Sequence, residues 1–270
     1  MGKLLRKPKL REQVVQDVRV GDGNSPLDYV GFKMLELAKG EVYEESLGKL
    51  EVCVVALTGR ITVTDLEQTF LNIGRRASVF ERIPTDSVYI SNDRSFRVIA
   101  ESDDARVALC YAPSDKQLKT MLIPAEANGM EQRGKYNNQR TVHNILPDSV
   151  DAANSLLVVE VYTEGGNWSS YPPHKHDQDN LPAESFLEES YYHEMNPAQG
   201  FVFQRVYTDD RSIDETMTVE NRDVVLVPAG YHPVGVPDGY TSYYLNVMAG
   251  PTRTWNFHND PAHAWILDRK

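Results

Sequence analysis

The chain has few cysteines and no long apolar runs, and each scarcity excludes a class of protein. Cys53 and Cys110 are the only cysteines in 270 residues, and both lie in apolar, strand-like runs. We therefore expect buried free thiols in a reducing cytoplasm and no disulfide framework. No run approaches the roughly 18 apolar residues of a membrane span. No apolar segment follows the basic N-terminus as it would in a secretory signal.

Positive charge is also scarce. The chain has 28 Lys and Arg residues against 39 Asp and Glu, which gives a formal net charge of -11. A surface for nucleic acid or anionic lipid needs an excess of Lys and Arg, so neither nucleic acid nor a membrane is expected as a partner. With 41% hydrophobic residues, the chain has enough apolar material for a buried core. The composition predicts an acidic globular protein of the cytoplasm.

Helical periodicity of useful length is lacking as well. Short runs rich in Val, Ile, Tyr and Phe dominate instead, and Gly, Pro, Asn and Asp separate them. Examples are "LEVCVVALTG", "NSLLVVEVYTEG" and "DVVLVPAG". This pattern is typical of an all-β sandwich or barrel.

Two segments look like copies of one unit. "DSVYISNDRSFRV", from Asp86, aligns with "DVVLVPAGYHPVGV", from Asp223, at an offset of about half the chain. The repeat predicts two related β domains that meet near the polar segment "EQRGKYNNQRTVHNI"; the alternative is chance similarity between two β-rich halves. We place the N-terminal domain at 1–135, without metal ligands, and a metal-binding C-terminal domain at 136–270.

The distribution of histidine locates the candidate chemistry. None of the seven histidines precedes His143, so an imidazole metal site can form only in the second half. His174 and His176 in "PPHKHD" are one residue apart, and on an extended strand both side chains face the same side. A downstream glutamate, together with His232 in "VPAGYHPV", would complete a set of donors that suits Zn²⁺ or another first-row divalent ion. The alternative is a solvent-exposed polar loop.

Two adjacent glutamates compete for the carboxylate position, and strand alternation separates them. With Glu189 facing inward, Tyr191 and His193 share its face, whereas with Glu188 facing inward Tyr192 does. Glu189 brings polar, proton-active groups towards the ion and is therefore preferred, with Glu188 as the alternative.

These residues also carry a resemblance to a known family. The HxH pair, the following glutamate and "DVVLVPAGYH" resemble the two motifs of the cupin superfamily, whose β-barrels hold a metal with three His and one Glu. The blocks "LEESYYHEMNPAQGFVFQRVYTDD" and "YYLNVMAGPTRTW" are similar to the bicupin family of 5-deoxy-glucuronate isomerases of myo-inositol catabolism, relatives of 4-deoxy-threo-hexosulose-uronate ketol-isomerase. The similarity covers nearly the whole chain. It implies two cupin domains and an aldose–ketose isomerase that interconverts 5-deoxy-D-glucuronate and 5-dehydro-2-deoxy-D-gluconate.

The resemblance carries the metal ligands over to His174, His176, Glu189 and His232. The expected ion is Zn²⁺, with Mn, Fe and Ni as alternatives. Two features depart from the general cupin pattern. Residues 177–188 separate the HxH pair from the glutamate, which means an inserted loop, and the second motif is PxGxH instead of PxGxxH.

An aldose–ketose isomerase must move a hydrogen between adjacent carbons. A base could do this through a cis-enediol while the metal polarises the C1 carbonyl and the C2 hydroxyl, and a metal-assisted hydride shift is the rival route. His193 and Tyr191 are the candidates for proton transfer, with packing of the barrel interior as their alternative role. Arg205 is the candidate for binding the substrate carboxylate, ahead of Lys175, and a structural salt bridge is the alternative.

Two other functions stay open at this point. One is another metal-dependent cupin enzyme, either a uronate ketol-isomerase or an Fe-dependent dioxygenase. The other is a non-enzymatic sugar-binding cupin, although no helix-turn-helix or basic segment supports a regulator. The expected partner is a small sugar acid. Exposed β-edges and a Trp-rich C-terminal tail also favour a homo-oligomer.

Overall fold

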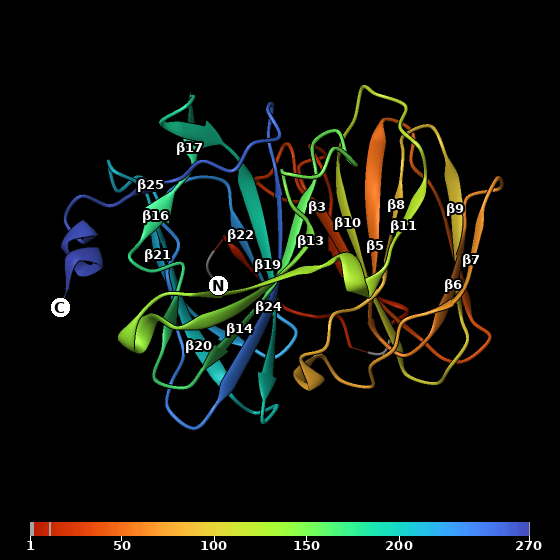
Figure 1. Ribbon diagram of the computed structural model, residues 1–270, viewed down its shortest axis with the longest axis horizontal. Coiled ribbons are helices and arrows are strands. Elements are labelled where there is room, and N and C mark those ends of the chain that lie inside the picture. The colour runs from red at the N-terminus through yellow and green to blue at the C-terminus, as the bar shows by residue number, and fades with distance from the viewer. Residues whose placement is uncertain (1–2, 11, 270) are drawn as a thin grey trace.

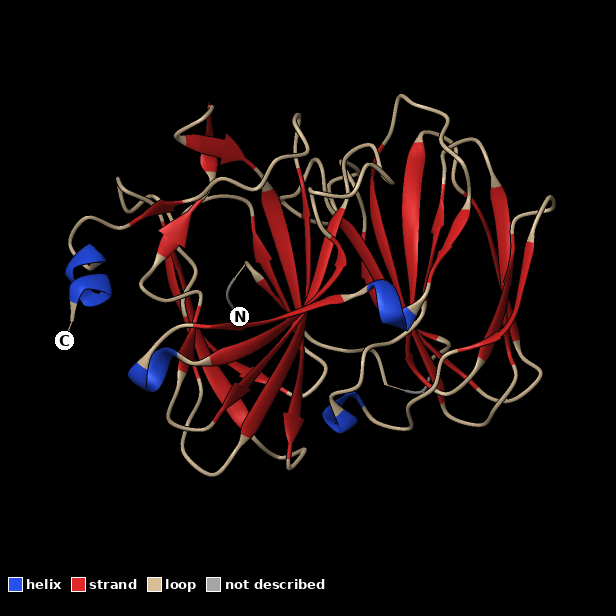
Figure 2. Cartoon of the chain, viewed as in Figure 1, coloured by secondary structure: helices blue, strands red, loops and turns tan. Residues whose placement is uncertain are grey.

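The computed structural model describes residues 3–10 and 12–269 and is built almost entirely from β-strands (Figures 1 and 2). The helices among these residues are four short 3₁₀ helices: η1 Val79–Glu81, η2 Ala125–Ala127, η3 Tyr136–Asn138 and η4 Ala264–Asp268. None of the described helices is long and apolar enough to cross a membrane. The expectation of an all-β chain is confirmed.

The first half of the chain forms two sheets that enclose an aliphatic core. The larger sheet has the order β11-β8-β5-β10-β3-β2 and the smaller one the order β4-β9-β6-β7. The larger sheet contains β2 Val14–Val18, β3 Gly31–Leu37, β5 Leu50–Thr58, β8 Ser87–Ile90, β10 Ala105–Pro113 and β11 Met121–Ile123. The smaller sheet contains β4 Val42–Ser46, β6 Ile61–Thr64, β7 Thr69–Ile73 and β9 Ser95–Ala100.

The second half forms a similar pair of sheets and two short ribbons. The large sheet has the order β1-β22-β19-β24-β14-β13-β12 and the small sheet the order β15-β23-β20-β21. The large sheet contains β1 Leu5–Arg6, β12 Gly129–Arg133, β13 Arg140–Leu146, β14 Leu157–Glu164, β19 Glu188–Asn196, β22 Val224–Val227 and β24 Thr241–Ala249. The small sheet contains β15 Trp168–Ser169, β20 Phe201–Tyr207, β21 Asp214–Glu220 and β23 Val234–Gly235. The ribbons pair β16 His174–Lys175 with β25 His258–Asn259, and β17 Asp177–Asn180 with β18 Glu184–Phe186.

The two halves repeat one strand order, as the duplicated motifs predict. Across the large sheets, β8-β5-β10-β3-β2 corresponds to β22-β19-β24-β14-β13, and the small sheets correspond strand for strand. The halves lie side by side in Figure 1, the first in red to yellow and the second in green to blue. The boundary expected at 135/136 stays a prediction. Strands β1 and β12 precede it in sequence, yet they pair with β22 and β13 in the large sheet of the second half.

A third apolar cluster joins the halves, because the two large sheets share it. Along β19 the side chains alternate between the two environments: Tyr191 and Met195 pack inside the second barrel, whereas Tyr192 packs into the shared cluster. Both faces of the strand are therefore buried, and its polar side chains, such as Glu188 and Glu189, are buried with its tyrosines. Cys53 and Cys110 lie in the shared cluster as buried free thiols, as expected.

Two buried carboxylates at equivalent places hold the halves together reciprocally. Glu51, on β5, accepts hydrogen bonds of 2.6–2.8 Å from the backbone N–H groups of residues 154–156, just before β14. Glu188, on β19, accepts hydrogen bonds of 2.7–3.1 Å from Asp28 and Tyr29, just before β3. Each half therefore fixes the start of a strand in the other.

Candidate metal centre

The connection between β15 and β19 is where the two halves differ most. In the first half, residues 47–49 join β4 to β5, whereas in the second half residues 170–187 make the equivalent connection and carry His174 and His176. Within it, β16 is held by pairing with β25 near the C-terminus. The inserted loop expected from the spacing is therefore an ordered segment that brings two histidines to the barrel (Figure 1).

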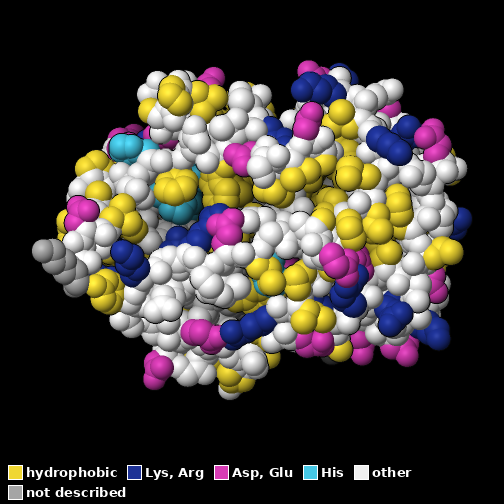
Figure 3. All heavy atoms as spheres, in the orientation of Figure 1, with side chains coloured by type: hydrophobic (Ala, Val, Ile, Leu, Met, Phe, Trp, Pro, Cys, Tyr) yellow, Lys and Arg dark blue, Asp and Glu magenta, His cyan; other side chains and the backbone are white. Residues whose placement is uncertain are grey.

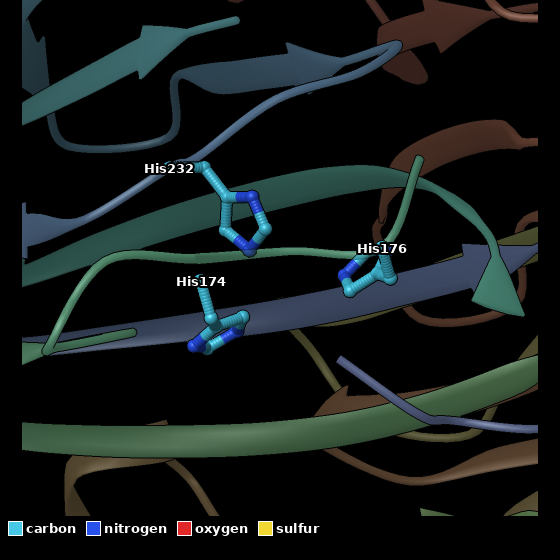
Figure 4. A group of neighbouring side chains, drawn as sticks. All are labelled: His174, His176 and His232. Atoms are coloured by element: carbon cyan, nitrogen blue, oxygen red, sulfur yellow. The ribbon is translucent and has the colours of Figure 1, made fainter. Parts of the chain in front are cut away.

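Three histidines converge in the second half. One candidate ligand atom from each of His174, His176 and His232 lies within 4.8 Å of the others. The three rings face a common space in Figure 4, with centroid separations of 5.0–6.2 Å. None of the three residues is more than 8% exposed. The structure thus brings together residues that are far apart in sequence, as a first coordination shell requires.

Glu189 joins this cluster from the inward face of β19. Its Oε1 lies 2.6 Å from Nε2 of His176, and its Oε2 lies 3.5 Å from Nε2 of His232. The shorter contact lacks hydrogen-bond geometry, and Oε1 and both Nε2 atoms are buried with no hydrogen-bond partner among the described residues. Buried polar atoms are normally paired, so these unpaired donors fit a divalent cation. Glu188 faces the first half instead.

The tautomers of two rings are set by backbone carbonyls. Nδ1 of His176 lies 2.8 Å from the carbonyl oxygen of Leu187, and Nδ1 of His232 lies 2.8 Å from that of Gly230. A carbonyl can only accept, so the proton of each neutral ring is on Nδ1. The lone pair on each Nε2 is therefore free to face the cluster, which is the usual arrangement of metal-binding histidines.

Burial and mutual proximity tune the charges in the cluster. Burial and the neighbouring imidazoles lower the pKa of His174, and burial also lowers that of His232. Burial lowers the pKa of His176 too, but the Glu189 carboxylate outweighs this effect and raises it. Burial alone would raise the pKa of Glu189, yet the imidazoles of His232 and His176 lower it well below its ordinary range. The carboxylate is therefore ionised, as a metal ligand must be.

The two residues expected to transfer protons lie at different depths. The ring of Tyr191 is 5.7 Å from that of His232, and its hydroxyl is 3.4 Å from Oγ of Ser170. The ring of His193 stacks on that of Tyr191, with the two ring centroids 6.1 Å apart. Its Nε2 lies 3.0 Å from Oε1 of Gln204. Burial lowers the pKa of His193 to about 4. The structure brings Tyr191 to the cluster and places a neutral His193 behind it, and both catalytic roles stay predictions.

Arg205 is not brought to the cluster. Its Nε and Nη2 bind both carboxylate oxygens of Asp214, at 2.8 and 2.7 Å, and the side chain is 42% exposed. The adjacent Gln204 is the residue of β20 that points inward, towards His193. Lys175 likewise binds a carboxylate, that of Asp177, at 2.6 Å. The geometry does not support a role for either cation in binding a substrate carboxylate.

Two pockets meet at His174. An outer pocket of about 440 Å³ and an inner one of about 30 Å³ both include His174 and Arg140. The inner pocket also contacts Tyr191, Tyr244 and Asn246. We did not predict roles for Arg140, Tyr244 or Asn246 from the sequence. Inward alternation along "TSYYLNVMAG" is the signal that could have identified the last two, whereas Arg140 stands in the segment that we interpreted as a joint between domains.

Comparison with known proteins places these features in context. Residues 4–266 match the sequence model of the KduI/IolB family. The chain is 72% identical to a protein of Bacillus licheniformis named 5-deoxy-glucuronate isomerase, over the full length of both chains. It is 66% identical to a protein of Listeria innocua with the same name, again over the full length of both.

Solved structures agree with the fold. An IolB-like protein from Salmonella typhimurium superposes with a TM-score of 0.94 at 49% identity, covering 98% of this chain and 99% of the other. An oxalate decarboxylase from Lactobacillus farciminis, solved as a formate complex, superposes with a TM-score of 0.64 at 12% identity, covering 100% of this chain and 91% of the other. At that identity the second likeness concerns the fold alone. The expected pair of cupin domains is confirmed.

Proposed function

The chain belongs to the KduI/IolB family, and we propose that it interconverts 5-deoxy-D-glucuronate and 5-dehydro-2-deoxy-D-gluconate with the help of a divalent metal ion. It is an isomerase by its full-length similarity to the Bacillus and Listeria proteins. The observation that carries the metal-dependent mechanism is the set of buried, unpaired donors converging in the second barrel. A role in myo-inositol catabolism is part of the same proposal.

We assign the metal ion to His174, His176, Glu189 and His232. Three imidazoles and one carboxylate are a common donor set for Zn²⁺, which is the metal we propose, and Mn, Fe and Ni accept the same donors. When bound, such an ion supplies a Lewis acid for the carbonyl and neighbouring hydroxyl oxygens of an open-chain sugar. The near-complete burial of the three histidines limits the access of water.

Tyr191 is the proton carrier that the geometry favours. Burial and the neighbouring Glu189 raise the pKa of Tyr191 well above its ordinary value, so the phenol keeps its proton at neutral pH. Its hydroxyl lies at the inner pocket beside Ser170, where it can donate a hydrogen bond to a sugar oxygen. The ring of His193 packs against those of Tyr191 and Tyr244, with centroids 6.1 and 5.5 Å away, and both tyrosines line the inner pocket, so we assign His193 a role in positioning them.

Removing the metal should abolish the reaction. We expect purified protein to convert 5-deoxy-D-glucuronate to the 2-deoxy-5-keto acid, as followed by NMR, and to stop when a chelator strips the ion. Zn²⁺ or another divalent ion added back should restore conversion. Conversion that continues at full rate after the ion has been stripped would contradict the metal assignment, and no conversion with any metal would contradict the isomerase. In D₂O, deuterium in the product indicates an enediol route.

Replacing Tyr191 with Phe removes only the hydroxyl. We expect turnover to fall by roughly 10²-fold, the lower end of what general acid–base catalysis contributes, while the metal content is unchanged. Tyr192→Phe is a matched control, because that hydroxyl binds Glu194 at 3.0 Å on the opposite face of β19. Equal turnover in the two variants would show that the Tyr191 hydroxyl has no part in proton transfer.

A further inference from the structure

The pockets beside the histidine cluster are cationic, although the chain as a whole is acidic. Lys135, Arg140 and Arg269 line the outer pocket, and its described lining contains no Asp or Glu. The inner pocket has Arg133 and Arg140 and again no acidic residue among those described. The net charge of the chain is -11, so this concentration of positive charge is local. Figure 3 shows Lys and Arg side chains, in dark blue, beside a histidine on the left half of the molecule.

Two of these arginines face each other across a hairpin. Arg133 ends β12 and Arg140 begins β13, and the strand register pairs them directly. Like charges at such positions repel, and the repulsion costs free energy unless an anion compensates it. Arg133 is compensated: its Nε donates to Glu131 at 2.8 Å, and its guanidinium lies 5.1 Å from the centre of the Trp255 ring.

Arg140 has no such compensation among the described residues. Its side-chain hydrogen bond runs from Nη1 to the backbone carbonyl of Asn138, at 3.0 Å, and it forms no ion pair with a described carboxylate. Burial lowers the pKa of Arg140, and the charge of Arg133 adds to this effect. A partly buried guanidinium in this state would be stabilised by a bound anion, and its planar donors match the two oxygens of a carboxylate.

We infer that Arg140 binds the carboxylate of the substrate and so fixes the orientation of the sugar acid. The inference rests on the proposed function, because the carboxylate is that of 5-deoxy-D-glucuronate. Arg140 and His174 both line the outer and the inner pocket, so one molecule can contact both. The carboxylate is at C6 and the aldehyde at C1. Holding the former at the β12–β13 hairpin therefore turns the reacting end towards the histidines.

The test compares the natural substrate with its analogue in which a primary alcohol replaces the carboxylate. For Arg140→Gln we expect kcat/KM on 5-deoxy-D-glucuronate to fall by about 10- to 100-fold, the range for hydrogen bonds to a charged group. The value on the alcohol analogue should change less than about threefold. Arg140→Lys keeps the charge but loses the fork of donors. Its kcat/KM on 5-deoxy-D-glucuronate should therefore lie between those of wild type and Arg140→Gln. Metal content, measured on the same samples, should match that of wild type.

Arg97→Gln is a matched control, because this half-exposed arginine binds Glu44 in the first half, at 2.6 Å. This variant should have the same kcat/KM as wild type on both the acid and the alcohol. The inference would be overturned if Arg140→Gln lowered kcat/KM equally on the acid and on the alcohol. It would also be overturned if Arg205→Gln, and not Arg140→Gln, lowered kcat/KM on the acid alone. Failure of the wild-type protein to convert 5-deoxy-D-glucuronate would contradict the proposed function itself. That result is distinct from an active wild type with an indifferent Arg140.

Discussion

Replacing His174 and His176 together with Ala is expected to abolish metal binding and to lower turnover of 5-deoxy-D-glucuronate by about 10³-fold or more. A Lewis acid contributes several kcal/mol of transition-state stabilisation, and each 1.4 kcal/mol is a factor of ten in rate. The two alanines remove half of the proposed donor set, leaving Glu189 and His232. Metal analysis of the purified variant and the NMR assay measure the two effects separately.

The fold should survive this double substitution. Both histidines lie in the connection 170–187, outside the two sheets that form the second barrel. Nε2 of His176 has no hydrogen-bond partner among the described residues, so the substitution removes from that residue only the hydrogen bond between its Nδ1 and the carbonyl oxygen of Leu187. The control replaces His258 and His263, which are exposed or half-exposed, and should keep both metal and activity. Full metal retention in the His174/His176 variant would refute the proposed ligand set.

Much of this site could be predicted from the sequence, because strand alternation is a local property. The parity of β19 separates Glu189, which faces the histidines, from Glu188, which binds the first half of the chain. The absence of histidine before His143 likewise places the cluster in the second barrel. Residue types alone made His232 a candidate fourth donor beside the HxH pair, and the family resemblance supported that assignment, because no local pattern specifies which strands pair.

The structure differs from the prediction at residues whose position depends on which strands pair with each other. Residues 131–145 contain polar turn signals, and we interpreted them as a joint between domains. They form the β12–β13 hairpin, which pairs with β14 and puts Arg140 at the pockets. Arg205 has the right charge, but its position on β20 turns it away from His193 and towards Asp214. Charge and residue type alone could not distinguish the two arginines.

The first barrel has no histidine, yet one of its arginines places a buried positive charge against a carboxylate of the second barrel. Arg76 is fully buried, and its Nη1 lies 3.2 Å from Glu160 on β14 and 3.1 Å from the hydroxyl of Tyr162. The hydroxyl of Tyr243 donates to the same Glu160 carboxylate at 2.8 Å. Burial alone would raise the pKa of Glu160, but the Arg76 guanidinium outweighs it and lowers the value to about 2. This network connects Arg76 of the first half to side chains on β14 and β24 of the second half.

Arg76→Met should therefore destabilise the whole chain. The substitution leaves the Glu160 carboxylate buried without its cation, a change that typically costs about 3–5 kcal/mol at neutral pH. In the wild-type protein, the contribution of Glu160 is complete above its unfolded pKa of about 4.5 and is lost as the pH falls towards 2. The difference in stability between the two proteins should consequently shrink on acidification. Urea unfolding at pH 7 and at pH 4 measures this difference.

Two further variants separate the buried charge from the loss of the side chain. Arg76→Met/Glu160→Gln removes the uncompensated charge as well as the cation, so it should regain part of the stability that Arg76→Met loses. Arg97→Met changes an ion pair with Glu44 in which both side chains are at least half exposed, and it should have no measurable effect. If Arg76→Met unfolded at the same urea concentration as wild type at pH 7, the network would not hold the halves together. The second barrel would then be stable without a charge from the first.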